Sequence, residues 1–228
     1  GVYKSRMTDG KFALGELSEP VSPPWHYINF IEGANCVYLH QHLFSSISPR
    51  TPIGRFIPRR CHNCWKVVIR PKTLKQLFAL ENLITQTGWP GKCGIERRSH
   101  TPLSKYRYGG YIYNNGHEQG LERLGKMREL LDQIPALNGV ECYLKRGCTE
   151  FELAFPDSST WEVTDEQHRI EDLLDWLIIS DVPTTMMPKH IVDKVHMVWI
   201  AWAAENGDET YKEYTDGPPL FTPCVTYA

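Results

Sequence analysis

Residues 59–84 read RRCHNCWKVVIRPKTLKQLFALENLI and combine a metal-ligand spacing, a short apolar run and an amphipathic segment. The run at 65–70 is apolar and β-branched, which predicts a buried strand. Pro71 follows it, and Thr73 stands three residues before Gln76, the spacing of a helix capping box. Apolar residues then recur at helical spacing. The stretch therefore predicts a strand followed directly by a helix.

The chain beyond this point continues the alternation of strands and helices. Composition predicts strands at 92–98 and 108–115, and a stripe of apolar residues predicts a helix at 121–134. Two further strands are expected at 139–147 and 148–155. The order β-α-β-β-α-β is the ferredoxin-like arrangement. Right-handed crossovers put both helices on one face of such an antiparallel sheet, so we predict an α+β fold with one open sheet face.

The regions on either side of this core have different predicted roles. Residues 1–58 are rich in Pro, Gly and Ser and contain a predicted β-hairpin at 26–44, so we expect an N-terminal arm. Residues 59–155 form the ferredoxin-like core. Residues 156–228 carry two amphipathic segments with helix capping signals, and we expect them to pack on the core as a C-terminal helical pair.

The cysteines predict a structural zinc site that ties the arm to the core. Cys61 and Cys64 form a Cys-x-x-Cys pair, which lets two thiolates bind one ion with little strain. Cys93 begins the next predicted strand, a position that this topology can bring near the pair. Cys36 is the expected fourth ligand and His40 the second choice. Free buried cysteines, an iron–sulfur cluster and a redox dithiol are the alternatives.

Cysteine usage and hydropathy also predict a location. The chain has seven cysteines, and an odd number beside a Cys-x-x-Cys pair favours a reducing compartment, so we expect a cytoplasmic protein. No apolar run approaches the length of a membrane span, and we expect no membrane partner.

Charge is distributed unevenly along the chain, although the formal net charge is only −2. Residues 50–107 carry 13 Lys or Arg and only two acidic residues, Glu81 and Glu96, whereas residues 150–228 carry 16 Asp or Glu and four basic residues. This asymmetry is typical of a basic patch that meets a polyanion. The alternative is that the two regions attract each other within the fold.

The basic region contains tyrosines in a predicted strand. Tyr111 and Tyr113 face one way in that strand and Ile112 the other, so both rings lie on the open face if Ile112 meets the helices. Basic and aromatic side chains on an open sheet predict binding of single-stranded RNA or DNA, or of another phosphorylated partner. Residues 107–113 resemble the third-strand signature of the RNA-recognition motif, with an extra glycine. The predicted binding residues are Arg59, Arg60, Lys66, Arg70, Arg97, Arg98, Arg107, Tyr111 and Tyr113. The alternative is that the C-terminal helices cover the tyrosines.

The sequence leaves open whether the protein is an enzyme. Glu150 and Glu152 form a carboxylate pair able to hold Mg²⁺ for a metal-dependent reaction on a phosphate-containing substrate. Cys148 is a candidate nucleophile, and the histidines considered as its base are His100, His117 and His168. A protein–protein assembly module is a third hypothesis.

Overall fold

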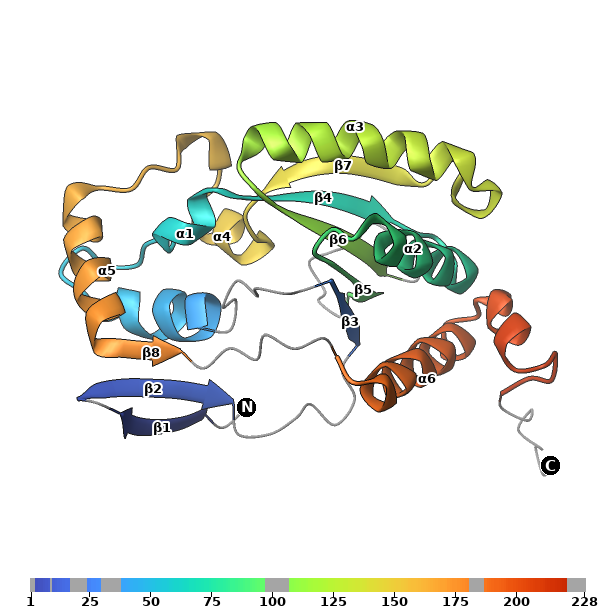
Figure 1. The fold of residues 1–228 in the computed structure, drawn as a ribbon, viewed down its shortest axis with the longest axis horizontal. Helices are drawn as coiled ribbons and strands as arrows, with labels where there is room; N and C mark the ends of the chain where they lie inside the picture. The colour runs from blue at the N-terminus through green and yellow to red at the C-terminus, as the bar shows by residue number, and fades with distance from the viewer. Residues whose placement is uncertain are drawn as a thin grey trace, which may run out of the picture.

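The structure is a computed structural model, and it describes residues 3–8, 10–16, 24–29, 38–96, 107–180 and 187–220. It contains a five-stranded antiparallel sheet covered on one face by helices, as predicted for an α+β fold (Figure 1). The strands in spatial order are β3 (Trp25–Ile28), β5 (Gly91–Ile95), β6 (Tyr108–Asn115), β4 (Cys64–Arg70) and β7 (Glu141–Arg146).

The helix that follows β4 forms where the local sequence predicts it. α2 (Leu74–Thr87) begins at Thr73, whose hydroxyl accepts a hydrogen bond from the backbone N–H of Gln76. It ends at Gly88, which adopts the left-handed conformation that favours glycine (φ 69°). It packs on β5 and β6, and Gly110 allows the close approach because a Cβ there would lie 2.5 Å from a methyl of Leu80.

Two further helices complete the apolar layer on this face of the sheet. α3 (His117–Gln133) packs along β4, β6 and β7 and is followed by a 3₁₀ turn, η3 (Pro135–Leu137). α6 (Lys189–Glu205) buries Val195, Trp199 and Ala203 in the same core and leads into η5 (Glu209–Tyr214). Asp208 joins these parts, since its buried carboxylate accepts hydrogen bonds from the Leu74 backbone N–H and the Tyr108 hydroxyl, at 2.6 and 2.8 Å.

A second, smaller core lies beside the sheet. It gathers the π-helical segment η1 (Tyr38–Ile47), α1 (Arg59–His62), α4 (Thr149–Ala154) and α5 (Asp165–Leu177). Phe151 is fully buried at its centre and packs against Phe44 and Trp161. The remaining short elements are η2 (Ser48–Arg50), η4 (Ser158–Thr160) and a three-stranded sheet of β1 (Tyr3–Thr8), β2 (Lys11–Glu16) and β8 (Ile178–Ser180).

Two predicted strands are wrong, and both lie in this smaller core. The second half of the predicted hairpin at 26–44 is π-helical, because Leu39, Leu43 and Phe44 all reach one apolar cluster through helical spacing. The turn predicted at 32–35 lies outside the described residues. The predicted strand at 148–155 is α4, in which helical geometry turns phenylalanines four residues apart into the same cluster.

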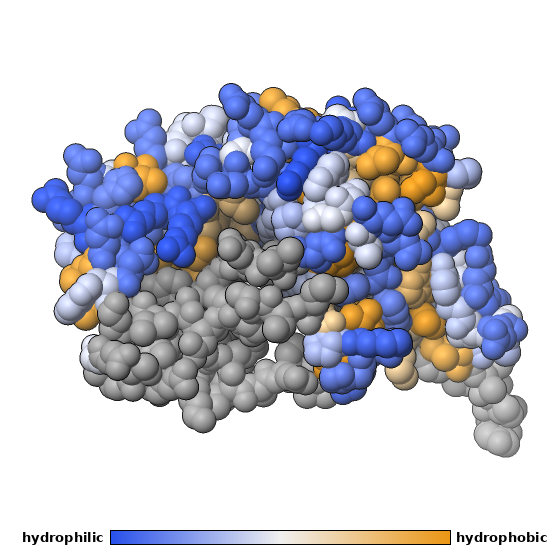
Figure 2. Space-filling view, in the orientation of Figure 1, coloured by the Kyte–Doolittle hydropathy of each residue, from blue (hydrophilic) through white to orange (hydrophobic). Residues whose placement is uncertain are grey.

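On the face drawn in Figure 2, the described surface is mostly hydrophilic, with groups of hydrophobic residues among the hydrophilic ones. Within the described ranges, no helix is both long and apolar enough to cross a membrane.

Candidate functional site

Strand alternation gives the five-stranded sheet two chemically different faces. Val67, Ile69 and Ile112 point into the helix-covered core and are fully buried. The alternate residues of the same strands therefore point to the other face. Tyr111 and Tyr113 lie there, as expected if Ile112 meets the helices. The C-terminal helix α6 packs on the opposite face and does not cover them.

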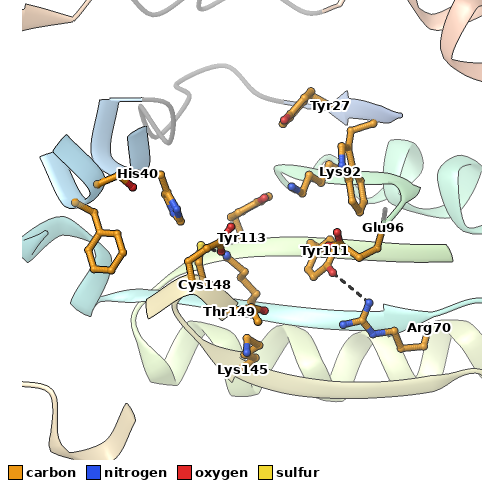
Figure 3. A pocket seen from close by; sticks show the side chains of 15 residues that line it. Tyr27, His40, Arg70, Lys92, Glu96, Tyr111, Tyr113, Lys145, Cys148 and Thr149 are labelled. Atoms are coloured by element: carbon orange, nitrogen blue, oxygen red, sulfur yellow. Dashed lines mark hydrogen bonds between the residues drawn. The ribbon is translucent and has the colours of Figure 1, made fainter. Parts of the chain in front are cut away.

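A pocket of about 330 Å³ lies over this second face (Figure 3). Strands β4, β5, β6 and β7 supply its floor, and β3, η1 and the start of α4 supply its walls. The cationic residues that line it are Lys66, Arg70, Lys92 and Lys145, the aromatic ones are Trp25, Tyr27, Phe44, Tyr111 and Tyr113, and the others are His40, Ser45, Glu96, Cys148, Thr149 and Glu150. The pocket thus combines positive charge with ring faces.

Cations and rings alternate at one end of the pocket. The Lys92 ammonium lies 4.4 Å from the Trp25 ring centre and 5.4 Å from that of Tyr111. Arg70 lies over the same Tyr111 ring and donates hydrogen bonds to the hydroxyls of Tyr111, at 3.1 Å, and Tyr143, at 3.3 and 3.4 Å. These phenols hold the guanidinium in place. Arg70 itself is only 6% exposed.

The other end of the pocket holds a thiol with unusual surroundings. The Lys66 ammonium donates a hydrogen bond to Cys148 Sγ at 2.6 Å, and the His40 ring also faces Cys148 (Figure 3). Burial alone would raise the pKa of Cys148, but the charge of Lys66 and hydrogen bonds from His40 and Lys66 outweigh it and lower the pKa to about 5. Cys148 is therefore a thiolate at neutral pH.

Backbone geometry fixes the position of this thiol. Gly147 precedes it with a φ of 63°, and a Cβ at Gly147 would lie 2.6 Å from the Trp161 ring, so only glycine fits this turn. His40 is also held in place, because its ring stacks on that of Phe151 at a centroid distance of 4.5 Å. The two groups that face the sulfur thus come from fixed elements, β4 and η1.

Two other thiols have the opposite character. Burial raises the pKa of Cys142, on the neighbouring strand, to about 12, and burial also raises that of Cys93. For Cys142 the charge of Arg128 opposes the effect of burial but does not outweigh it, and for Cys93 the charge of Glu81 adds to the effect of burial. Among the described cysteines, Cys93, Cys142 and Cys148 are free thiols.

The predicted nucleic-acid-binding residues are only partly brought together. Lys66, Arg70, Tyr111 and Tyr113 line the pocket. Arg59 instead donates hydrogen bonds to Asp172 and Asp175 on α5, which is the internal charge pairing considered as the alternative. Arg60 is exposed on α1, and Arg107 stands just before β6. Arg97 and Arg98 lie outside the described residues.

The predicted zinc ligands are not brought together either. Cys64 is opposite Asn115 of β6, whereas Cys93 is opposite Gly110 of the same strand. Five residues of strand correspond to about 17 Å, and β6 lies between the two cysteines. A zinc–sulfur bond is about 2.3 Å long, so Cys93 cannot share an ion with the Cys61 and Cys64 pair. Cys36 lies outside the described residues.

The structure also places the candidate catalytic residues in different parts of the fold. His117 packs on Trp65 of β4, whose side chain is on the helix-covered face, and His168 belongs to α5. His100 lies outside the described residues. Glu152 forms an ion pair with Lys145, while Glu150 reaches the pocket.

Sequence reasoning missed several pocket residues. The sequence predicts His40 only as a metal ligand and does not predict Lys92, Trp25 or Tyr27 as binding residues. Side chains alternate between the two faces of a strand, and this rule alone puts Lys92 on the opposite face of the sheet from the buried Cys93. The pairing of β3 with β5, which brings Trp25 and Tyr27 beside Lys92, cannot be predicted from local sequence.

No family model matches the chain, and searches of curated proteins and of solved structures also found no match.

Proposed function

We propose that the pocket binds a phosphorylated ligand that carries an aromatic base, with single-stranded RNA or DNA as the leading class. The observation that carries this proposal is the combination of Arg70 and Lys92 with the rings of Trp25 and Tyr111 in one cavity. Bases stack on aromatic side chains, and phosphates are attracted by Lys and Arg.

The charges in the pocket favour one end for the phosphate. Lys66 faces the Cys148 thiolate and Lys145 pairs with Glu152, so these two cations are already matched with negative groups. Arg70 donates to phenol hydroxyls, which do not cancel the charge of a guanidinium. The phosphate is therefore expected near Arg70, with the base on the rings beside it. A cavity of about 330 Å³ is at the small end of the range for ligand sites and suits one nucleotide of a strand.

A filter-binding titration with short RNA and DNA at two salt concentrations tests the proposal. Affinity should fall steeply with salt, because each phosphate contact releases counterions. Arg70→Gln should weaken binding and lower the salt dependence by about one phosphate contact. Lys126→Gln is the matched control, since Lys126 is an exposed lysine of α3. Binding that is absent, or insensitive to salt and to Arg70→Gln, would overturn the proposal.

A second candidate is an enzyme that acts on a phosphate-containing substrate with Cys148 as the nucleophile. The contact of Lys66 with Cys148 favours it, because a thiolate is the reactive form of cysteine. In the proposed step the sulfur attacks phosphorus, an S–P bond forms as the P–O ester bond breaks, and the leaving oxygen takes a proton. Water then hydrolyses the thiophosphate and regenerates the thiol.

Turnover of an aryl phosphate distinguishes the two candidates. Cys148→Ser should abolish turnover and the acid-labile intermediate in which Cys148 is phosphorylated, and it should leave nucleic-acid binding intact. Cys142→Ser should change neither turnover nor binding. Equal turnover in wild type and Cys148→Ser would exclude the enzyme hypothesis without affecting the binding proposal.

We also infer a ferredoxin-like core and a cytoplasmic location. The order β7-β4-β6-β5, with α2 and α3 as the connections between β4 and β5 and between β6 and β7, supports the first inference. A functional thiolate must stay reduced, which supports the second.

A further inference from the structure

Three metal-ligating side chains converge on the helix-covered side of the sheet, away from the pocket. His26 comes from β3, Glu81 from α2 and His196 from α6. His26 Nδ1 lies 2.5 Å from Glu81 Oε1, and His196 Nε2 lies 2.6 Å from the same oxygen. The three elements are distant in sequence, so only the fold brings these groups together.

We propose that His26, Glu81 and His196 bind one divalent transition-metal ion, with zinc as the expected metal. Two imidazole nitrogens and one carboxylate oxygen form a donor set found in three-ligand zinc sites, which keep a fourth position for water. Among the described residues, this trio is the one group of three or more potential ligands whose donor atoms all lie within 4.8 Å of one another.

The observed distances require only a small opening to admit an ion. Zinc bonds of about 2.0–2.1 Å at tetrahedral angles place neighbouring donor atoms about 3.3 Å apart. The two contacts to Glu81 are 2.5 and 2.6 Å, so each must lengthen by less than about 1 Å, which side-chain rotation supplies. The third separation, between the two nitrogens, is at most 4.8 Å, so it needs to change by at most about 1.5 Å.

Burial favours a site that holds an ion and still exchanges it with solvent. The side chain of Glu81 is 8% exposed, whereas those of His26 and His196 are 17% and 29% exposed. Phe78 and Trp199 pack around the His196 ring, at centroid distances of 5.0 and 5.2 Å, and limit its movement. The buried carboxylate of Glu81 thus lies beneath the two more exposed imidazoles, so that a cation can enter from the side of the histidines.

The proposed ion has a structural consequence. It would bind β3 and α6 to α2 and so connect segments from both ends of the chain to the central sheet. The sequence predicts a zinc ion that ties the N-terminal arm to the core through cysteines, and the proposed site would provide a similar connection through different ligands.

Metal content and thermal unfolding of the full chain test the site. After chelator treatment, wild type should take up about one Zn²⁺, and Co²⁺ in its place should give visible ligand-field absorption. Zinc at about 100 times its dissociation constant should raise Tm by roughly 5–10 °C. His196→Gln should weaken zinc binding by more than about 100-fold and remove the Tm shift, because loss of a direct ligand exceeds the effect of a supporting residue.

Two controls keep the test decisive. Cys61→Ser combined with Cys64→Ser should leave zinc uptake and the Tm shift unchanged, and so should His168→Gln on α5. If His196→Gln does not fold, Glu81→Gln replaces it, since the amide keeps the shape of the carboxylate and lacks its charge. No uptake of Zn²⁺, Co²⁺ or Fe²⁺ by wild type would overturn the proposal. The proposal would also be overturned if the double cysteine variant lost zinc uptake and His196→Gln kept it.

Discussion

Replacement of Lys66 by Met should raise the pKa of Cys148 and reduce its reactivity near neutral pH. The ammonium donates to Sγ at 2.6 Å, and its charge is the largest of the causes that lower this pKa from 9.0 to about 5. Methionine keeps the apolar volume of the lysine stem, and the burial of the thiol remains. The variant therefore removes the charge that stabilises the thiolate and keeps the burial that raises the pKa of Cys148.

The expected magnitude follows from the charge. One opposite charge within contact distance shifts a pKa by about 1–3 units, and a contact this short and buried belongs to the upper part of that range. A rise of about 2–3 units places the pKa of Cys148 near 7–8. At pH 6 the thiolate fraction would then fall from about 90% to roughly 1–10%, a loss of about 10- to 100-fold.

Isotope-coded alkylation, read peptide by peptide in a mass spectrometer, measures this pKa in the presence of the other cysteines. The pH midpoint of Cys148 labelling is the quantity to compare, because intrinsic thiolate reactivity also changes with pKa. Cys142 is an internal reference, since its pKa of about 12 keeps it unlabelled below pH 9 while the core is packed. Lys72→Met, at an exposed lysine before α2, is the matched control.

A wild-type midpoint near 9 would refute the reasoning, and so would a Lys66→Met midpoint within half a unit of wild type. The same pKa shift predicts a stability profile. The folded pKa lies below the unfolded one, so the thiolate stabilises the fold fully above pH 9 and progressively less as the pH falls toward 5. In Lys66→Met the folded pKa is closer to the unfolded one, so the stabilisation should be smaller and should be lost at a higher pH, near 7–8 instead of 5.

The other predictions concern ligand binding and the core. Tyr111→Ala should cost about 1–3 kcal/mol of single-strand binding, the range for one stacked base, measured by the same filter-binding titration; unchanged affinity would place the base elsewhere. Gly110→Ala should lower the free energy of unfolding in urea by about 1–3 kcal/mol, because its Cβ would lie 2.5 Å from a methyl of α2. Gly125→Ala, with open space around it on α3, should instead be neutral or stabilising by up to about 1 kcal/mol, and equal effects at both glycines would contradict the packing argument. Asp208→Ala should lower the unfolding free energy by about 1–3 kcal/mol, since it leaves the first N–H of α2 and a buried tyrosine hydroxyl without their acceptor. The exposed Asp132→Ala is its control, and an equally small effect in both would show that Asp208 is not an essential cap.

Local patterns predicted much of the central sheet and part of the pocket. The capping box at Thr73 and the glycine at residue 88 define α2 because both act through hydrogen bonds and backbone angles within a few residues. The period of two in β6 placed Tyr111 and Tyr113 on one face opposite Ile112 for the same reason. These features depend on neighbours in the chain.

The sequence misled where one pattern suits two structures. Residues 148–155 alternate polar and apolar side chains as a strand does, yet Phe151 and Phe155 are also four residues apart, as on one face of a helix. The apolar cluster beside the sheet decides between them, because helical geometry buries the Phe151 ring in it and packs the Phe155 ring against it. The π-helical segment at 38–47 is decided by the same cluster.

By itself, the sequence determined the strand and helix of residues 65–87, the division of β6 into two faces and the uneven charge. Only the tertiary structure decided what each reactive group meets. Lys66 and Cys148 are 82 residues apart and meet because β4 and β7 pair in one register. His26 and His196 reach Glu81 across intervals of 55 and 115 residues. Periodicity and capping act over a few residues, whereas such meetings depend on strand register and on which apolar faces are buried together, and no short stretch of chain contains that information.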